Sequence, residues 1–311
     1  MGGVGVSGLF AAPGLAETVY EILRTDDREE TRALRARMEE MWEVFEPYAD
    51  PHFLIEFRTR LNARYWEMYL ARAFIGAGYR VMSDPSGPDL CLTYDGQRIW
   101  VEAVEATQGA EGSPDRTPDF GDDSVVDYPE EQVLLRLRNA IDAKRAKRET
   151  YLESGLVTPA DAYVIAINAG RIPYAFGMED PPRILNAVYP IGALQIHIRS
   201  SDGEVVGVDN AYRPSVSKVN GSSVSTDVFL DAAYSGISGV IYSGSNAWNM
   251  PAVVGTDMAL VHNLLAAVPL PKGWYPFGHE WSAMREGDGY RMMRADQPDS
   301  PEAGDDKSPA R

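Results

Sequence analysis

Two acidic residues flank a predicted β-hairpin in the segment GPDLCLTYDGQRIWVE, which spans residues 87–102. An Asp-Gly pair lies there between two apolar, β-prone runs, a strong signal for a hairpin with a two-residue loop. Counting outward from that loop along both strands places Asp89 opposite Glu102. Facing side chains of an antiparallel pair have Cβ atoms about 4.5–5.5 Å apart, and like charges in such positions destabilise the sheet. Because a divalent cation bound by both carboxylates would remove the repulsion, the hairpin predicts a metal site.

A third carboxylate, that of Glu67, lies on the helix predicted ahead of the hairpin. Large apolar side chains recur there every four positions and glycines follow, which predicts one continuous helix over 52–78. The recurring residues are Phe53, Phe57, Leu61, Tyr65 and Tyr69. Glu67 is either a further metal ligand or an ordinary residue of the helix's polar face. Asp89 has a similar alternative as a strand-entry residue, whereas Glu102 lies in an apolar strand, where burial of an unpaired charge costs several kcal/mol.

These residues resemble a known group of proteins. The chain is similar to the PD-(D/E)XK nuclease superfamily, which has the restriction-endonuclease-like fold. The similarity lies in the order of its features: a helix with Glu, then Pro-Asp, a hairpin, and an apolar strand with Glu-x-x. Position by position, Asp89 matches the Asp of Pro-Asp, Glu102 the acid of the second half-motif and Glu67 the helical acid. The resemblance covers residues 61–166, and the chain up to 263 is similar to bacterial proteins with this core. It implies Mg²⁺- or Mn²⁺-assisted hydrolysis of DNA phosphodiesters, with the three acids as catalytic residues and metal ligands.

The chain departs from the superfamily pattern at one position. The superfamily's lysine, two residues after the acid, falls at Val104. Glu105 is a further acid there, but strand alternation points it to the opposite face unless a bulge intervenes. Lys144, on a helix predicted over 129–154, is the best catalytic substitute, with Arg136 two turns earlier on the same side. The alternative is that Lys144 belongs to an ordinary solvated basic face of the helix. In that case the protein is catalytically degenerate and keeps the fold as a binding or structural module.

Charge is segregated along the chain. The formal net charge of −17 argues against broad adhesion to nucleic acid. Segment 111–131 has eight acidic residues and one arginine, whereas segment 132–150 has six basic residues and two acidic ones. DNA is therefore expected along 132–150, unless both segments are solvated surfaces of opposite charge. Another phosphate-bearing substrate, a protein partner at the acidic segment and a homodimer stay open.

The order of predicted elements indicates an α/β (α+β) fold, a mixed central sheet flanked by helices. Further strands are expected at 161–168, 239–243 and 258–262, and as a pair at 194–198 and 204–208. The predicted organisation is an N-terminal helical extension (1–50), a nuclease-like core (51–170), a C-terminal part packed on the core (171–295) and a disordered tail (296–311).

Composition excludes several other functions. The single cysteine, Cys91, excludes an internal disulfide and a Cys-based zinc site, and the four histidines lack ligand spacing. Neither a Gly-x-Ser-x-Gly elbow nor a Walker motif is present. Because no apolar run reaches the ~18 residues of a membrane span, a cytoplasmic protein without a membrane partner is expected.

Overall fold

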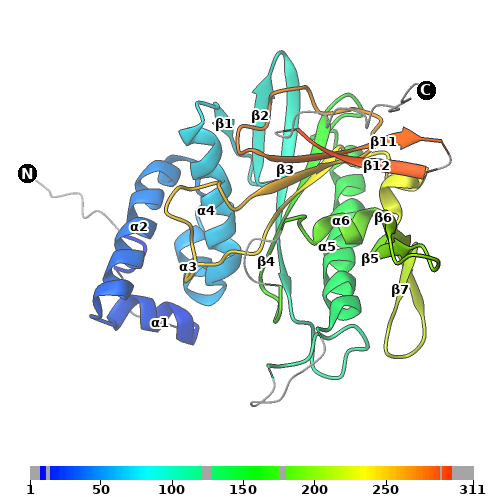
Figure 1. Cartoon of the computed structure of the whole chain (residues 1–311). Coiled ribbons are helices and arrows are strands. Elements are labelled where there is room, and N and C mark those ends of the chain that lie inside the picture. The colour runs from blue at the N-terminus through cyan, green and yellow to red at the C-terminus, as the bar shows by residue number, and fades with distance from the viewer. Residues whose placement is uncertain (1–7, 12–14, 121–127, 176–179, 288, 296–311) are drawn as a thin grey trace, which may run out of the picture.

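The computed structural model describes residues 8–11, 15–120, 128–175, 180–287 and 289–295 (Figure 1). The helices are α1 (Thr18–Thr25), α2 (Glu29–Phe45), α3 (Phe53–Thr59), α4 (Leu61–Gly76), α5 (Glu130–Glu153) and α6 (Ile184–Val188). The strands are β1 (Val81–Met82), β2 (Leu90–Tyr94), β3 (Gln97–Thr107), β4 (Ala162–Arg171), β5 (Ile191–Ile198), β6 (Val205–Tyr212), β7 (Ser215–Ser217), β8 (Ser223–Ser225), β9 (Gly239–Ser243), β10 (Ala259–His262), β11 (His279–Glu286) and β12 (Gly289–Arg294). The tail predicted beyond residue 295 lies outside the described residues.

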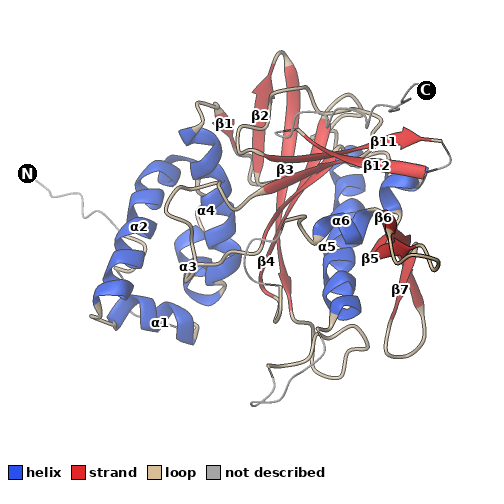
Figure 2. Ribbon diagram, in the orientation of Figure 1, coloured by secondary structure: helices blue, strands red, loops and turns tan. Residues whose placement is uncertain are grey.

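One mixed sheet of eight strands forms the centre, in the order β1-β2-β3-β4-β9-β10-β11-β12. The pairs β3–β4, β4–β9 and β10–β11 are parallel and the others antiparallel. Helices α1–α4 lie on one side of this sheet and α5 and α6 on the other (Figure 2). The predicted mixed sheet flanked by helices is therefore confirmed.

The hairpin of β2 and β3 has the predicted register. Tyr94 faces Gln97, and the pairing continues without a shift to Leu90 opposite Val101. Both loop residues have positive φ, 48° at Asp95 and 80° at Gly96. A two-residue loop whose twist matches that of the strands requires this backbone, which explains the Asp-Gly sequence.

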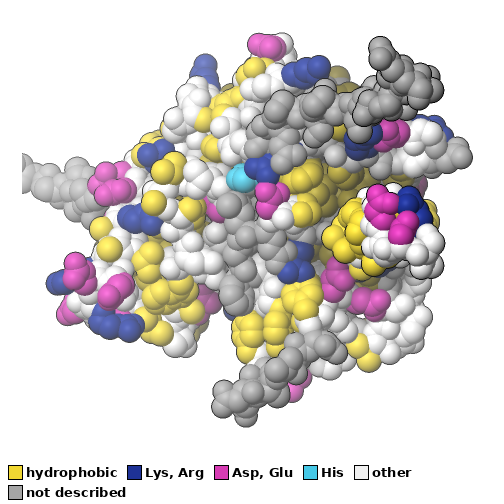
Figure 3. All heavy atoms as spheres, in the orientation of Figure 1, with side chains coloured by type: hydrophobic (Ala, Val, Ile, Leu, Met, Phe, Trp, Pro, Cys, Tyr) yellow, Lys and Arg dark blue, Asp and Glu magenta, His cyan; other side chains and the backbone are white. Residues whose placement is uncertain are grey.

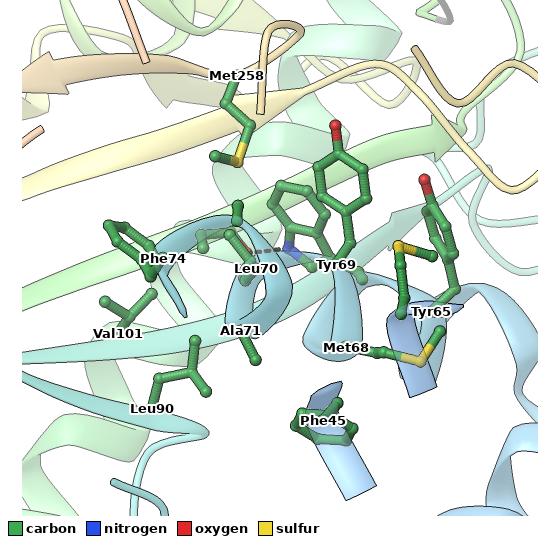
Figure 4. Close-up of a cluster of buried hydrophobic side chains, with 14 of the residues drawn as sticks. Phe45, Tyr65, Met68, Tyr69, Leu70, Ala71, Phe74, Leu90, Val101 and Met258 are labelled. Carbon is green, nitrogen blue, oxygen red and sulfur yellow. Dashed lines mark hydrogen bonds between the residues drawn. The ribbon is translucent and has the colours of Figure 1, made fainter. Parts of the chain in front are cut away.

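The two faces of the central strands have separate cores. Leu90 and Val101 point toward α4, where Tyr65 and Tyr69 also lie (Figure 4), and Val164 belongs to the same buried cluster. Alternate residues of the same strands pack instead against α5; they are Cys91, Trp100, Tyr163 and Ile165. Since successive side chains of a strand point to opposite faces, the face of each β3 residue follows from its number. Glu102 consequently belongs to the α5 side.

The single helix predicted over 52–78 is wrong, because it is interrupted at Arg60 (φ −144°, ψ 49°). There the carboxylate of Glu17 accepts a hydrogen bond from the backbone N–H of Leu61 at 2.6 Å. This bond satisfies one of the free N–H groups at the start of α4, so a second helix begins. The apolar stripe continues across the break, with Phe57 and Leu61 both buried.

The later strands are extensions of the sheet and separate hairpins. Strands β9 and β10 occur where the sequence predicted them, and β5 pairs with β6 as expected. The β5–β6 pair, however, forms a sheet of its own outside the central one. The pairing of β11 with β12 was not predicted. Every helix in the described ranges is too short or too polar to traverse a bilayer.

Candidate active site

A pocket of about 400 Å³ opens where α4, the start of β2, β3 and α5 meet. Its walls include two of the predicted acids, Glu67 and Asp89, together with Lys144. The other lining residues are Arg60, Ala63, Arg64, Ala103, Val104, Glu105, Thr107 and Lys147. Acidic and basic groups from four separate elements therefore converge on one opening.

Glu102 lies completely buried beside this pocket, with both carboxylate oxygens engaged. Its Oε1 accepts hydrogen bonds from the ammonium groups of Lys144 at 2.5 Å and Lys147 at 2.8 Å. Its Oε2 accepts one from the Tyr151 hydroxyl at 3.1 Å. Charge-assisted bonds of this kind are the strong ones, and they balance the burial of the carboxylate.

Helix α5 delivers all three donors to Glu102. Lys144, Lys147 and Tyr151 are spaced three and four residues apart, so they form one stripe on the helix. Lys144 thus contacts Glu102 from the helix on which the sequence analysis placed it as the substitute for the lysine that is absent at position 104. The sequence analysis missed Lys147 and Tyr151, and their helical spacing from Lys144 is the signal that could have found them.

Asp89 directly precedes β2 and faces the position of Glu102 across the hairpin. Its Oδ2 accepts a hydrogen bond from the backbone N–H of Ala103 at 2.7 Å, two residues beyond Val101, where the backbone pairing with β2 ends. Burial, together with the charge of Glu102, raises the pKa of Asp89 to about 6. The backbone ladder ends at Leu90 and Val101, so the proximity of the two carboxylates shows in the effect of the Glu102 charge on Asp89.

Glu67 reaches the same pocket from α4. Its Oε2 accepts a hydrogen bond from Arg64 at 2.6 Å, but Arg64 is shared with Asp50 at 2.9 Å and with Glu56 at 2.6 Å. Burial and the charge of Asp89 raise the pKa of Glu67 to about 7. One arginine divided among three carboxylates thus leaves Glu67 incompletely neutralised.

Position 104 and its neighbour behave as strand alternation predicts. Val104 lies on the α5 side and packs partly against the core there. Glu105 is on the α4 side, where its carboxylate accepts a hydrogen bond from Asn62 at 3.0 Å and lies 3.6 Å from Arg171. The register with β4 shifts just after Glu105, and this side chain lines the pocket as well.

Most arginines of the basic stretch 132–150 serve internal contacts. Arg136 binds the Thr107 carbonyl and Asp115, and Arg138 is buried against Ser225 and Asp142. Arg145 and Arg148 contact Tyr234, Ala233, Tyr163 and Glu149. The positive groups of this stretch at the pocket are the two lysines, joined there by Arg60, which lies between α3 and α4, and by Arg64 of α4.

The carboxylate oxygens at the pocket suit a hard divalent cation, which prefers oxygen ligands of this kind. Asp89 Oδ1 and Glu67 Oε1 accept no hydrogen bond from any described residue, so each leaves one oxygen for a ligand. Across the described ranges, however, no three His, Cys, Asp or Glu side chains are grouped to hold a metal ion. Glu102 already binds two lysines through Oε1 and one hydroxyl through Oε2, so its remaining acceptor capacity is on Oε2.

A larger hollow of about 480 Å³ lies elsewhere, between α2, α4 and residues 250–254. Its lining contains one acid, Glu40, together with Arg37 and Arg72. Since facing carboxylates are absent from that lining, the smaller pocket remains the candidate site.

No protein-family model, curated protein or solved structure matches the chain.

Proposed function

We propose that the protein is a divalent-cation-dependent phosphodiesterase that cleaves DNA in the cytoplasm. The proposal is carried by one observation: two partly buried acids with raised pKa values share a pocket with two lysines, directly beside a third acid that is fully buried. Perturbed acids and bases that converge in a pocket are typical of catalytic sites. The element order behind the nuclease resemblance, a helix, a hairpin, a helix and a parallel strand, supports it further.

Each group has a role in this proposal. In this proposal Asp89 and Glu67, with Glu102, would hold a Mg²⁺ or Mn²⁺ ion, and the bound ion would polarise the scissile phosphate and lower the pKa of an attacking water. Lys144 supplies the positive charge that Val104 cannot, and it stabilises the negative charge that develops on the phosphate oxygens. Lys147 and Arg60 attract the phosphate backbone, because their side chains remain 48% and 66% exposed.

Plasmid cleavage tests the proposal. Supercoiled DNA is incubated with the full chain and Mg²⁺ or Mn²⁺, and nicked product is measured. We expect cleavage by the wild type and its loss in Asp89→Asn. The matched control is Asp161→Asn, which makes the same chemical change in a buried carboxylate outside the pocket. Cleavage that survives Asp89→Asn at the wild-type rate would remove the assignment.

A degenerate binding module is the second candidate, and a specific observation favours it. Both oxygens of Glu102 are occupied by Lys144, Lys147 and Tyr151, an arrangement that stabilises the fold without any cation. Calorimetric titration with Mn²⁺ separates the two candidates. The nuclease binds Mn²⁺ and loses it in Asp89→Asn, whereas the degenerate module binds none.

A further inference from the structure

The hairpin of β5 and β6, hereafter the arm (residues 191–212), is apolar in a way that its surroundings do not explain. It forms a two-stranded sheet separate from the central one. Seven of its large apolar side chains are more than half exposed, namely Leu194, Ile196, Ile198, Val205, Val206, Val208 and Tyr212. Figure 3 shows hydrophobic side chains gathered over this part of the molecule.

The register of the arm places most of these side chains on one face. Ile196 faces Val208 across the hairpin, and alternation adds Leu194 on the same strand. A register shift after His197 pairs Ile198 with Val205, so the neighbouring valine at 206 is the extra residue of a bulge.

The other face of the arm is polar. Gln195 faces Asp209, and the imidazole of His197 lies 3.1 Å from the Asp209 carboxylate. An amphipathic strand pair normally buries its apolar face against a core. In the arm, both the polar and the apolar face are exposed.

An isolated two-stranded hairpin is at best marginally stable in water, and it needs a third strand or a packed face. The exposed side chains of the arm present on the order of several hundred Å² of apolar surface, at or above the largest patch of a typical monomer. This area approaches the ~800 Å² that each partner contributes to a standard interface. The arm therefore carries nearly enough apolar surface for a stable complex.

We propose that the apolar face of the arm binds the same face of a second copy of the chain. Two such faces related by a two-fold axis are self-complementary, as a closed dimer requires. None of the seven side chains is charged, so two copies with a net charge of −17 each can meet there without opposing like charges. The ionic groups at the tip are paired among themselves, with Arg199 at 3.0 Å from Asp202 and 2.6 Å from Glu204. An uncharged face is unsuited to DNA phosphates, and an acidic chain is repelled by anionic lipid.

Sedimentation velocity of the full chain, from about 1 to about 100 μM, tests this proposal. We expect the wild type to sediment as a dimer at the upper end of this range. Ile196→Lys places a charge in the middle of the apolar face and should weaken association at least ~10-fold. The matched control is Gln195→Lys, the adjacent residue on the polar face, where the same new charge faces Asp209 and association should persist.

Val208→Lys, on the opposite strand of the same face, repeats the disruption in case Ile196→Lys fails to fold. Circular dichroism and a thermal melt identify the folded variants. A wild type that is monomeric at about 100 μM overturns the proposal and assigns the face to a different protein partner. Association of folded Ile196→Lys and Val208→Lys at the wild-type strength also overturns it.

Discussion

An acid lies beside each end of β3, and the two acids have opposite electrostatic surroundings. Near the hairpin turn, Asp161 accepts two hydrogen bonds of 2.7 Å from Arg98 and a third, also of 2.7 Å, from the Thr158 backbone N–H. Although burial opposes the charged form, these bonds lower the pKa of Asp161. At the other end Asp89 faces another acid, and its pKa is raised. Asp161 is thus paired with an arginine, whereas Asp89 lies beside a second carboxylate.

This difference separates a structural pair from a candidate catalytic cluster. Asp161 has enough hydrogen-bond donors around it to stabilise its negative charge, so its ionised form stabilises the fold. Asp89 and Glu67 do not, and crowded carboxylates of this kind persist mainly where function requires them. The contrast predicts that variants of the Asp161 end change stability, whereas variants of the Asp89 end change activity.

The largest expected effect is that of Glu102→Gln on DNA cleavage. The neutral amide keeps the shape of the side chain but removes the charge that binds Lys144 and that would bind the proposed cation. We expect a loss of about 100- to 10,000-fold in kcat, measured on linear DNA with Mg²⁺. Asp161→Asn, the control from the other end, should retain activity within about threefold at a temperature where it is folded. Equal losses of kcat in the two variants would contradict the proposed difference between the two ends of β3.

Lys144→Met should lower kcat by about 100-fold, since it removes a positive group from the proposed phosphate site while keeping the aliphatic stem. Lys147→Met is the matched variant, because it removes the second ammonium on Glu102 from a more exposed position. It should raise KM more than it lowers kcat. A larger fall in kcat for Lys147→Met would reverse the roles of the two lysines.

Asp161→Asn should lower the free energy of unfolding by about 2 kcal/mol at pH 7, because it removes the charge-assisted bonds to Arg98. Urea denaturation measures this difference. Since the folded pKa of Asp161 is lowered, its contribution is present above its ordinary pKa of 3.8 and is lost as the pH falls below that value. A difference that is unchanged at pH 3 would contradict this role.

The smallest expected effect is that of Glu67→Gln on stability. Unlike Asp161→Asn, this substitution should increase the free energy of unfolding. Because the folded pKa of Glu67 is raised from 4.5 to about 7, the fold binds the proton more tightly and loses stability as the pH rises through this interval. The variant cannot ionise there, so at pH 8 it should be more stable than the wild type by about 1 kcal/mol. Chemical denaturation at pH 5 and pH 8 measures both values. A variant less stable at pH 8 would show that the bond to Arg64 outweighs the crowding.

The sequence predicted the features of this site that depend on local rules. Asp-Gly fixed the loop of the hairpin, and strand alternation then decided the faces of Glu102 and Glu105. The break before α4 was missed because its capping group, Glu17, lies 44 residues away in the chain. The sharing of Arg64 among three nearby acids was missed because, in the single helix predicted over 52–78, Glu56 would lie about 12 Å along the axis from Arg64.

The central claim is that the acid end of the hairpin binds a divalent cation. Anomalous scattering from crystals of the full chain soaked in Mn²⁺ tests it most directly. The account predicts a peak within bonding distance, about 2–2.5 Å, of the Asp89 carboxylate, with Glu102 or Glu67 as a second ligand. Crystals of Asp161→Asn should show the same peak. Saturated crystals with no peak at Asp89, or with Mn²⁺ bound only elsewhere, would contradict the account.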